Sequence, residues 1–388
     1  MSDTAGMFED EAAQEARVAP DPAVRRRRAL AGARRTLVDR PRNLRQSLAA
    51  LADGAEGAYD LDELPDRYGN GVVAALEDRV AELLGMPAAA FFPTGTMAQQ
   101  VALRCWAGRT GIATVALHPL AHPEMYERDA LSALSGLRGV HPTRERRLPT
   151  AAEVADLDEP IGTLMLELPL REAGFVLPSW QELTAVVAAG RERDAVVHFD
   201  GARLWECGPH FGRSLPELAE LADSVYVSFY KSLGGMSGAA LAGPADFVAE
   251  AKAWRHRYGG QLFEQWPAAL SALAGLRTEL PRLAAYVAHA KTVAAALTEA
   301  LAPLPWSRVH PAVPHTHQFQ VWLPFAASAL GEAVLAQAEE DGVMLFSWWS
   351  EPGPPGLSMT EVTVASDALE WTARDVREAV EGLLRRLV

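Results

Sequence analysis

Val197-His198-Phe199-Asp200-Gly201-Ala202-Arg203, followed by Ser228-Phe229-Tyr230-Lys231, is the stretch of sequence that says most about the fold. In each segment an apolar run typical of a buried strand leads to one ionisable side chain, Asp200 in the first and Lys231 in the second. Apolar neighbours would desolvate the Lys231 amine and favour its neutral, nucleophilic form. Glycines follow at 234, 235 and 238, and they would let the backbone approach a ligand closely.

A lysine and an aspartate at the ends of neighbouring strands match the needs of pyridoxal phosphate. The lysine bonds to the cofactor aldehyde, and the aspartate keeps the pyridine nitrogen protonated so that the ring accepts electrons. Arg203 would face the cofactor phenolate or a substrate carboxylate, with a surface salt bridge as the alternative. Lys231 alone would suggest a surface lysine, and Asp200 alone a helix cap. The pair together predicts an enzyme of amino-acid chemistry.

The fold class follows from short apolar runs that alternate with helical segments. Such runs predict an α/β protein with a large, mostly parallel sheet covered by helices on both faces. Functional groups in such a sheet gather at the carboxyl ends of the strands, where Thr94, Glu167, Asp200 and Lys231 all stand. The runs are Ala113–Leu117, Thr163–Leu168, Ala195–Phe199, Ser224–Phe229 and Ala239–Ala242.

Three regions are expected along the chain. Residues 1–35 are predicted to be a polar, flexible arm, and the arginines at 25–28 indicate a solvated helix face or loose tail more than a nucleic-acid contact. Residues 36–280 are predicted to form the large cofactor-binding domain. Residues 281–388, with strand-like 318–323 and helical 373–387, are predicted to form a small C-terminal α/β domain.

Composition restricts the partners. The 36 basic and 50 acidic residues give a net charge of −14, which argues against nucleic acid or an anionic membrane. No apolar run has the length of a membrane span or the form of a signal peptide. Two cysteines, Cys105 and Cys207, suit a reducing cytosol without structural disulfides. We therefore expect a cytoplasmic enzyme with a small amino-acid substrate and no metal, since His315 and His317 are too sparse for a metal site.

Two further segments add candidate site residues. Thr94-Gly95-Thr96 lies between a strand and a helix, where backbone N–H groups and the helix dipole would bind the cofactor phosphate. His122 follows the run 113–117, where an imidazole would stack on the pyridine ring and relay a proton. His118 competes for that role, and a hydrogen-bonded structural histidine is the alternative for either.

Together these strings resemble the threonine aldolase and β-eliminating lyase family of fold-type-I pyridoxal-phosphate enzymes, from about residue 66 to 243. Asp66-Arg67-Tyr68-Gly69 is similar to a tyrosine-bearing entry segment, and 92–98 to the phosphate-binding turn. Segment 122–127 is similar to the one carrying the stacking histidine, and 198–203 is the closest match. The resemblance implies a fold-type-I transferase-like fold. It also implies Lys231, His122 and Asp200 as catalytic residues, Arg203, Thr94, Gly95, Thr96 and Ser228 as cofactor ligands, and Tyr68, Glu127, Glu167 and Arg171 beside the substrate.

The chain departs from that family where a substrate carboxylate would bind. An Arg-Ser-Asp-Thr-like segment is missing before Asp66, and residues 359–365 lack the expected arginine and histidine. Residues 259–263 also lack the arginine of a Gly-Gly-Gly-x-Arg loop, which in the family reaches across the dimer interface toward the cofactor phosphate. A carboxylate without its cation loses about 1.5–3 kcal/mol per hydrogen bond. Either Arg171, Arg255 or Arg257 substitutes, or the substrate differs. Trp348 and Trp349 would wall a larger or more apolar substrate, with core packing as the alternative.

The predicted activity is retro-aldol cleavage of a β-hydroxy-α-amino acid with a non-standard substrate, by a homodimer or homotetramer. β-Elimination or transaldolase exchange on an uncommon amino acid is the alternative within the same chemistry. A non-catalytic binding or assembly module that retains the fold is the alternative from another class.

Overall fold

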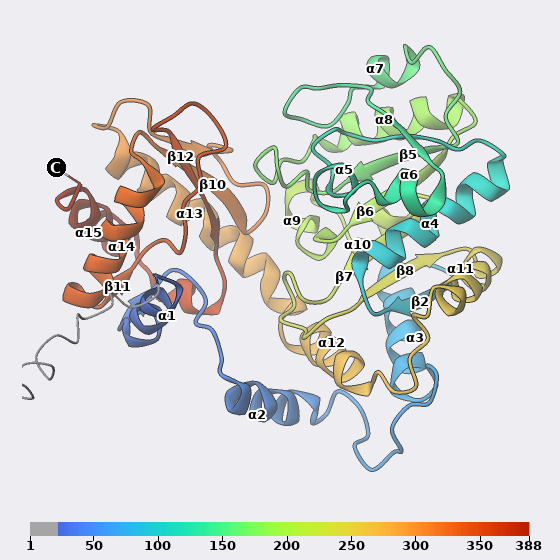
Figure 1. Ribbon diagram of the computed structural model, residues 1–388, viewed down its shortest axis with the longest axis horizontal. Helices are drawn as coiled ribbons and strands as arrows, with labels where there is room; N and C mark the ends of the chain where they lie inside the picture. The colour runs from blue at the N-terminus through green and yellow to red at the C-terminus, as the bar shows by residue number, and fades with distance from the viewer. Residues whose placement is uncertain (1–21, 388) are drawn as a thin grey trace, which may run out of the picture.

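The protein is described by a computed structural model that covers residues 22–387, and it forms two bodies joined by helix α13 (Leu283–Leu301) (Figure 1). The larger body is built on a seven-stranded sheet with the order β2-β8-β7-β6-β5-β3-β4. Its strands are β2 (Ala88–Phe92), β3 (Thr114–Ala116), β4 (Arg138–Val140), β5 (Thr163–Glu167), β6 (Val196–Gly201), β7 (Ser224–Ser228) and β8 (Ala239–Gly243).

The sheet is parallel except at β8, which runs antiparallel to both β2 and β7. The predicted α/β fold with a mostly parallel sheet is confirmed. Glu167 pairs in register with Asp200, and Asp200 pairs with Tyr226 of β7. The carboxyl ends of β5, β6 and β7 therefore meet at one edge, and the chain beyond Ser228 brings Lys231 to that edge.

Helices cover both faces of this sheet because side chains of a strand point alternately to its two sides. Phe91 packs in the core beneath α3 (Val72–Leu84), α8 (Trp180–Glu192) and α12 (Trp266–Thr278). Phe92 packs in the opposite core beneath α4 (Gly95–Thr110) and α11 (Ala245–Arg257). The remaining elements are α2 (Leu44–Ala55), which lies against α12, and α5 (His122–Tyr126), α6 (Ala130–Ser135), α7 (Ala151–Ala155), α9 (Gly208–Phe211), α10 (Leu215–Ala219), η1 (Leu204–Glu206) and η2 (Leu280–Arg282).

The smaller body combines the C-terminal part of the chain with its first described residues. A three-stranded antiparallel sheet, β12-β10-β9, packs with the C-terminal helices around one apolar core. Its elements are β9 (Arg308–His310), β10 (Gln318–Leu323), α14 (Ala327–Asp341), β11 (Val343–Met344), β12 (Ser358–Thr363), η3 (Ser366–Glu370) and α15 (Ala373–Leu384). Among them, β10 coincides with the strand predicted at 318–323, and α15 covers most of the helix predicted at 373–387.

The N-terminal segment differs from the expected flexible arm. Residues 22–36 form α1 (Pro22–Gly32) and β1 (Arg35–Thr36), which lie beside α14 and β11 in the smaller body (Figure 1). Leu30 is buried in the core of that body, and Arg25 forms ion pairs with Glu332 and Glu339 of α14. Apolar burial and charge pairing therefore fix this segment, and Leu37 belongs to the same core. Residues 1–21 of the predicted arm lie outside the described residues.

Within residues 22–387, none of the helices combines the length and the apolar character that a membrane crossing requires.

Candidate active site

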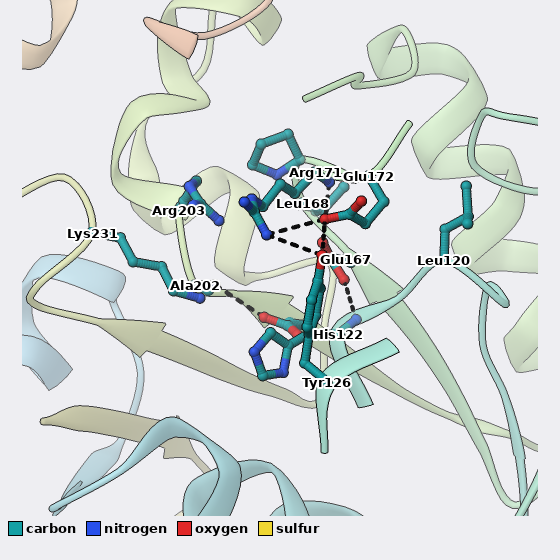
Figure 2. Close-up of a pocket in the computed structure, with 12 residues that line it drawn as sticks. Leu120, His122, Tyr126, Glu167, Leu168, Arg171, Glu172, Ala202, Arg203 and Lys231 are labelled. Atoms are coloured by element: carbon teal, nitrogen blue, oxygen red, sulfur yellow. Dashed lines mark hydrogen bonds and ion pairs between the residues drawn. The ribbon is translucent and has the colours of Figure 1, made fainter. Parts of the chain in front are cut away.

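A cavity of about 230 Å³ opens at the carboxyl edge of β5, β6 and β7. Figure 2 shows the Lys231 side chain entering it from one side, with the guanidinium groups of Arg171 and Arg203 above and the His122 ring below. Five predicted site residues thus meet Asp200 in one place. The wall consists of Leu120, His122, Tyr126, Glu167, Leu168, Pro169, Arg171, Glu172, Asp200, Ala202, Arg203 and Lys231.

Lys231 and Asp200 supply the amine and the carboxylate predicted from the sequence. Burial and the nearby Arg203 charge lower the pKa of Lys231, while Asp200 and Glu167 oppose that shift. Asp200 is buried at the end of β6, and its Oδ1 accepts a hydrogen bond from the Ala202 N–H at 3.1 Å. Burial raises the pKa of Asp200, and the charge of Lys231 lowers it. The site thus disfavours the charged form of this amine, which faces the same cavity as the fixed Asp200 carboxylate.

His122 is oriented by a chain of buried polar groups. Its Nδ1 lies 3.1 Å from Glu127 Oε1, and Gln100 Nε2 donates to Glu127 Oε2 at 2.8 Å. Because Glu127 accepts only, Nδ1 carries the proton and Nε2 has a free lone pair. The competing His118 bonds the Glu145 carbonyl and the Leu120 N–H and lies outside the cavity wall, so it has a structural role.

Glu167 holds two segments of the cavity wall together. Its carboxylate accepts the backbone N–H of His122 at 2.8 Å and that of Arg171 at 3.1 Å. Burial and the neighbouring Asp200 charge raise the pKa of Glu167 to about 7. Glu167 is thus placed to position His122 and Arg171 and to share the negative charge of the site with Asp200.

Of the three arginines considered as carboxylate ligands, Arg171 is the one on the cavity wall. It forms ion pairs with Glu361 at 2.9 Å and Glu172 at 3.0 Å. Arg255 is buried under the sheet, where it pairs with Glu77 at 3.0 Å and donates to the Phe91 carbonyl. Arg257 lies on α11 with its guanidinium 4.5 Å from the Trp254 ring centroid. The structure therefore leaves Arg171 and Arg203 as the cations of the site.

The predicted phosphate turn forms the N-terminus of α4. Thr94 is the N-cap, and its hydroxyl accepts the Met97 N–H at 3.2 Å. Gly95 packs against the Tyr226 ring so closely that a Cβ there would collide with the Tyr226 hydroxyl. Tyr226 pairs in register with Asp200, so the turn with Thr94, Gly95 and Thr96 lies near the same edge of the sheet. Their contact with a phosphate remains a prediction.

Ser228 and Tyr68 are not on the cavity wall. The buried Ser228 hydroxyl donates to the Ala202 carbonyl at 2.9 Å and so braces the end of β7 against the segment after β6. Tyr68 is 57% exposed, and its ring packs edge-on against Phe263 at 5.4 Å. The expectation that Tyr68 lines the site is therefore not met within one chain, because Tyr68 lies on the surface beside residues 261–263.

A buried ion pair behind the lysine joins the two bodies. His317, which directly precedes β10, has Nε2 2.9 Å from Glu206 Oε2 and Nδ1 2.7 Å from the Val364 carbonyl. Ser232, next to Lys231, donates to the same Glu206 oxygen. Both imidazole nitrogens face acceptors, so His317 is an imidazolium. The charge of Glu206 and its hydrogen bond raise the pKa of His317 against the effect of burial.

The residues fit pyridoxal phosphate. The buried Arg203 Nε has no hydrogen-bond partner within the described chain, and it stands beside a cavity that offers the lysine amine and the Asp200 carboxylate. An acidic ring oxygen would satisfy that donor, and a pyridinium nitrogen would neutralise Asp200. Over residues 22–387 no three His, Cys, Asp or Glu side chains are grouped to hold a metal ion.

Sequence reasoning missed a second cavity that shares Lys231 with the first. Asp39, Gln318 and Glu361 line it, together with Trp348 from the aromatic loop. Trp349, by contrast, packs against Phe346 in the core of the smaller body. Two signals pointed to this region: the absence of an arginine at 359–365, and Trp348, which was expected to wall the substrate.

Comparisons with known proteins agree with the geometry. The family model of beta-eliminating lyases matches residues 42–320. The solved structure of a candidate L-allo-threonine aldolase from Listeria monocytogenes EGD-E is 34% identical, with a TM-score of 0.85 and coverage of 94% of this chain and 100% of that one. A candidate aromatic amino acid beta-eliminating lyase/threonine aldolase from Exiguobacterium sp. 255-15 is also 34% identical, with a TM-score of 0.84, covering 93% and 99% of the two chains.

A low specificity L-threonine aldolase from Escherichia coli O157:H7 is 32% identical over 227 residues, which are 56% of this chain and 67% of that protein. The family model and the near-complete structural match, read with the Lys231–Asp200 site, show that this chain belongs to the threonine aldolase and beta-eliminating lyase family of fold-type-I enzymes, with pyridoxal phosphate as its cofactor.

Proposed function

We propose that the protein is a carbon–carbon lyase that cleaves a β-hydroxy-α-amino acid by a retro-aldol reaction. The observation that carries the proposal is one cavity in which Lys231 and Asp200, the two ligands of the cofactor ring, face Arg171, a cation suited to a substrate carboxylate. The similarity to proteins named threonine aldolases supports the same reaction type.

Each residue of the site has a separate role in the reaction, which its position determines. Bound pyridoxal phosphate supplies the electron sink for the pair released when the Cα–Cβ bond breaks. Arg171 receives the α-carboxylate in its fork, and Glu167 holds the backbone of Arg171 and His122 at the correct spacing. His122 keeps its proton on Nδ1 toward Glu127 and accepts the β-hydroxyl proton at Nε2. Asp200 would balance the positive charge of a protonated pyridine nitrogen.

A product assay tests this proposal. Purified protein with pyridoxal phosphate is incubated with a panel of β-hydroxy-α-amino acids, and the aldehyde and the smaller amino acid are quantified. We expect both in equal amounts, and borohydride treatment should fix the cofactor to Lys231 as seen by peptide mass. Protein that takes up no pyridoxal phosphate would contradict the proposal and favour a non-catalytic module. Release of ammonia and a keto acid without aldehyde would favour β-elimination, and incorporation of an added aldehyde into a new amino acid would favour transaldolase exchange.

We also propose that the protein is a cytoplasmic homo-oligomer. Tyr68, Leu262 and Phe263 form an exposed apolar cluster, and Leu61 and Leu64 in the preceding loop are exposed as well. A second copy of this chain would cover such a surface, in keeping with the predicted homodimer or homotetramer. Light scattering after gel filtration tests it, because Phe263→Ser should lower the assembled mass if this surface is the interface. A wild-type monomer would contradict it.

A further inference from the structure

The second cavity, here called the side-chain chamber, has a volume of about 290 Å³ and lies between Lys231 and the smaller body. Because Lys231 lines both cavities, a substrate attached there can extend its side chain from the first cavity into the chamber. Its wall is made by Leu37, Val38, Asp39, Lys231, Gln318, Leu345, Phe346, Ser347, Trp348, Glu361, Val362 and Thr363.

The charged groups of the chamber are mainly carboxylates. It contains two carboxylates, Asp39 and Glu361, and its one cation is Lys231, which binds the cofactor. Asp39 has no ion pair or hydrogen bond with any of the described residues. Gln318 is 6% exposed, and its Nε2 donates to Thr363 at 3.0 Å, whereas its Oε1 has no partner among residues 22–387. The chamber therefore carries two carboxylates against one amine, which is the reverse of a site for an anion.

Glu361 is tied to the substrate carboxylate through Arg171. Arg171 pairs with Glu361 at 2.9 Å and with Glu172 at 3.0 Å. A substrate carboxylate that enters the Arg171 fork competes with these two partners. Glu361 is mostly buried, and a buried carboxylate that loses its cation is unfavourable until another cation replaces it.

We infer that the substrate carries an ammonium or guanidinium group at the end of its side chain, and that this group binds Glu361 in the side-chain chamber. The inference rests on the proposed function, since it assumes that the α-carboxylate goes to Arg171. The substrate carboxylate then pairs with Arg171, and the cation of its side chain pairs with Glu361. Each charge of the separated Arg171–Glu361 pair therefore keeps a counter-ion. Leu345, Phe346 and Trp348 cover the methylene stem, as apolar walls do for long basic side chains. Asp39 and Gln318 Oε1 accept the remaining donors.

Binding of unreactive amino acids tests the inference apart from the retro-aldol reaction. Lysine and norleucine differ only in the terminal amine, and each is titrated into the holoenzyme while the visible absorbance of the cofactor is followed. We expect lysine to bind more tightly by on the order of tenfold to a hundredfold, the effect of one or two charge-assisted hydrogen bonds. Equal dissociation constants, or tighter binding of norleucine, would overturn the inference.

Two variants locate the effect. Glu361→Gln keeps the shape of the chamber and removes its charge, so the preference for lysine should disappear while norleucine still binds. Glu172→Gln is the matched control, because it removes the other carboxylate partner of Arg171 but lies outside the chamber. It should change both dissociation constants by the same factor. A lysine preference that survives in Glu361→Gln would overturn the assignment of Glu361, and the melting temperature and cofactor content of each variant show that it is folded.

The reaction itself gives an independent readout. β-Hydroxylysine and β-hydroxynorleucine are supplied as a matched pair, and kcat/KM is measured from aldehyde release. A higher value for β-hydroxylysine that Glu361→Gln abolishes supports the inference. Equal values with ample aldehyde overturn the inference and leave the proposed function standing. No aldehyde from either compound, with a lysine preference in the titration, would remove the proposed reaction and retain the cation site.

Discussion

The two sides of the active site differ in how their residues are distributed along the chain. On the large-body side, Asp200 and Lys231 each stand at or just beyond the end of a strand, inside a recognisable string. On the small-body side, Asp39, Gln318 and Glu361 come from three distant segments, and none belongs to a motif. The first side supplies the chemistry that the family shares, and the second side faces the variable end of the substrate. The residues that determine the reaction type therefore lie in short, recognisable sequence segments. The residues that are proposed to select the substrate are brought together only by tertiary packing.

The largest expected effect is on the large-body side, at the amine itself. Lys231→Ala should reduce aldehyde release below detection, because among residues 22–387 no other amine lines the first cavity to bond the cofactor. The protein should also lose its colour on gel filtration. The exposed Lys291 of α13 is the matched control, and Lys291→Ala should retain both colour and activity. Retained activity in Lys231→Ala would contradict the assignment of the reaction chemistry to the large-body side of the site.

A smaller loss is expected when the proton acceptor is removed and the stacking ring is kept. His122→Phe should lower kcat by about 10²–10⁴-fold, the range for a lost general base, with cofactor affinity nearly unchanged. Glu127→Gln should lower kcat less, since the amide oxygen can still accept from Nδ1. The measurement is kcat together with the dissociation constant of pyridoxal phosphate. A loss of cofactor binding that matches the loss of kcat would show that His122 only holds the ring.

The buried Glu206–His317 pair tests whether the contact between the two bodies stabilises the fold. Glu206→Gln should lower the free energy of unfolding by about 3–5 kcal/mol, because it leaves the buried His317 imidazolium without its counter-ion. In the wild type the raised pKa of His317 means that its contribution is complete below pH 6.5 and is lost as pH rises through the folded-state value. Denaturant unfolding across this pH range should show the decline, and Glu206→Gln should flatten it. The exposed Arg374–Glu378 pair is the control, and Glu378→Gln should have little effect.

The smallest effect is expected at the turn before α4. Thr94→Ala should cost about 1 kcal/mol of stability, since Met97 N–H loses its acceptor, and Thr94→Ser should restore it. Thr96→Ala should instead weaken pyridoxal-phosphate binding by on the order of tenfold if its hydroxyl contacts the phosphate. Thermal unfolding and cofactor titration separate the two outcomes. An unchanged cofactor affinity in Thr96→Ala would limit the turn to its backbone N–H groups.

The features that the sequence predicted correctly depend on residues that lie close together along the chain. The strands that lead to Asp200 and Lys231 are buried on both faces, so each could be recognised as a continuous apolar run. The strand β10 matches its predicted bounds at 318–323. Thr94 was recognisable as the residue between a strand and a helix. Arg171 was one of three candidate arginines, and only tertiary packing separated it from Arg255 and Arg257.

The parts that could not be predicted depend on contacts between distant segments. Arg25 in a basic run suggests a solvated face until α14 brings Glu332 and Glu339 beside it. Tyr68 was expected at the site from its string, yet its segment lies on the surface of the single chain. The ion pair between Glu361 and Arg171 joins residues that are far apart along the chain, and no sequence pattern around either residue predicts it.

The small body includes a strand pair between Arg35–Thr36 and Val343–Met344, so it draws on both ends of the described chain. On the ribosome, β1 emerges among the first of these residues and must wait for nearly all of the remaining polypeptide before its partner exists. The large body, whose sheet closes with β8 at Gly243, can be complete well before that moment. Biogenesis therefore has a built-in order: the catalytic scaffold precedes the lobe that is proposed to select the substrate, and a nascent chain that ends before residue 327 lacks α14, the helix that packs on α1.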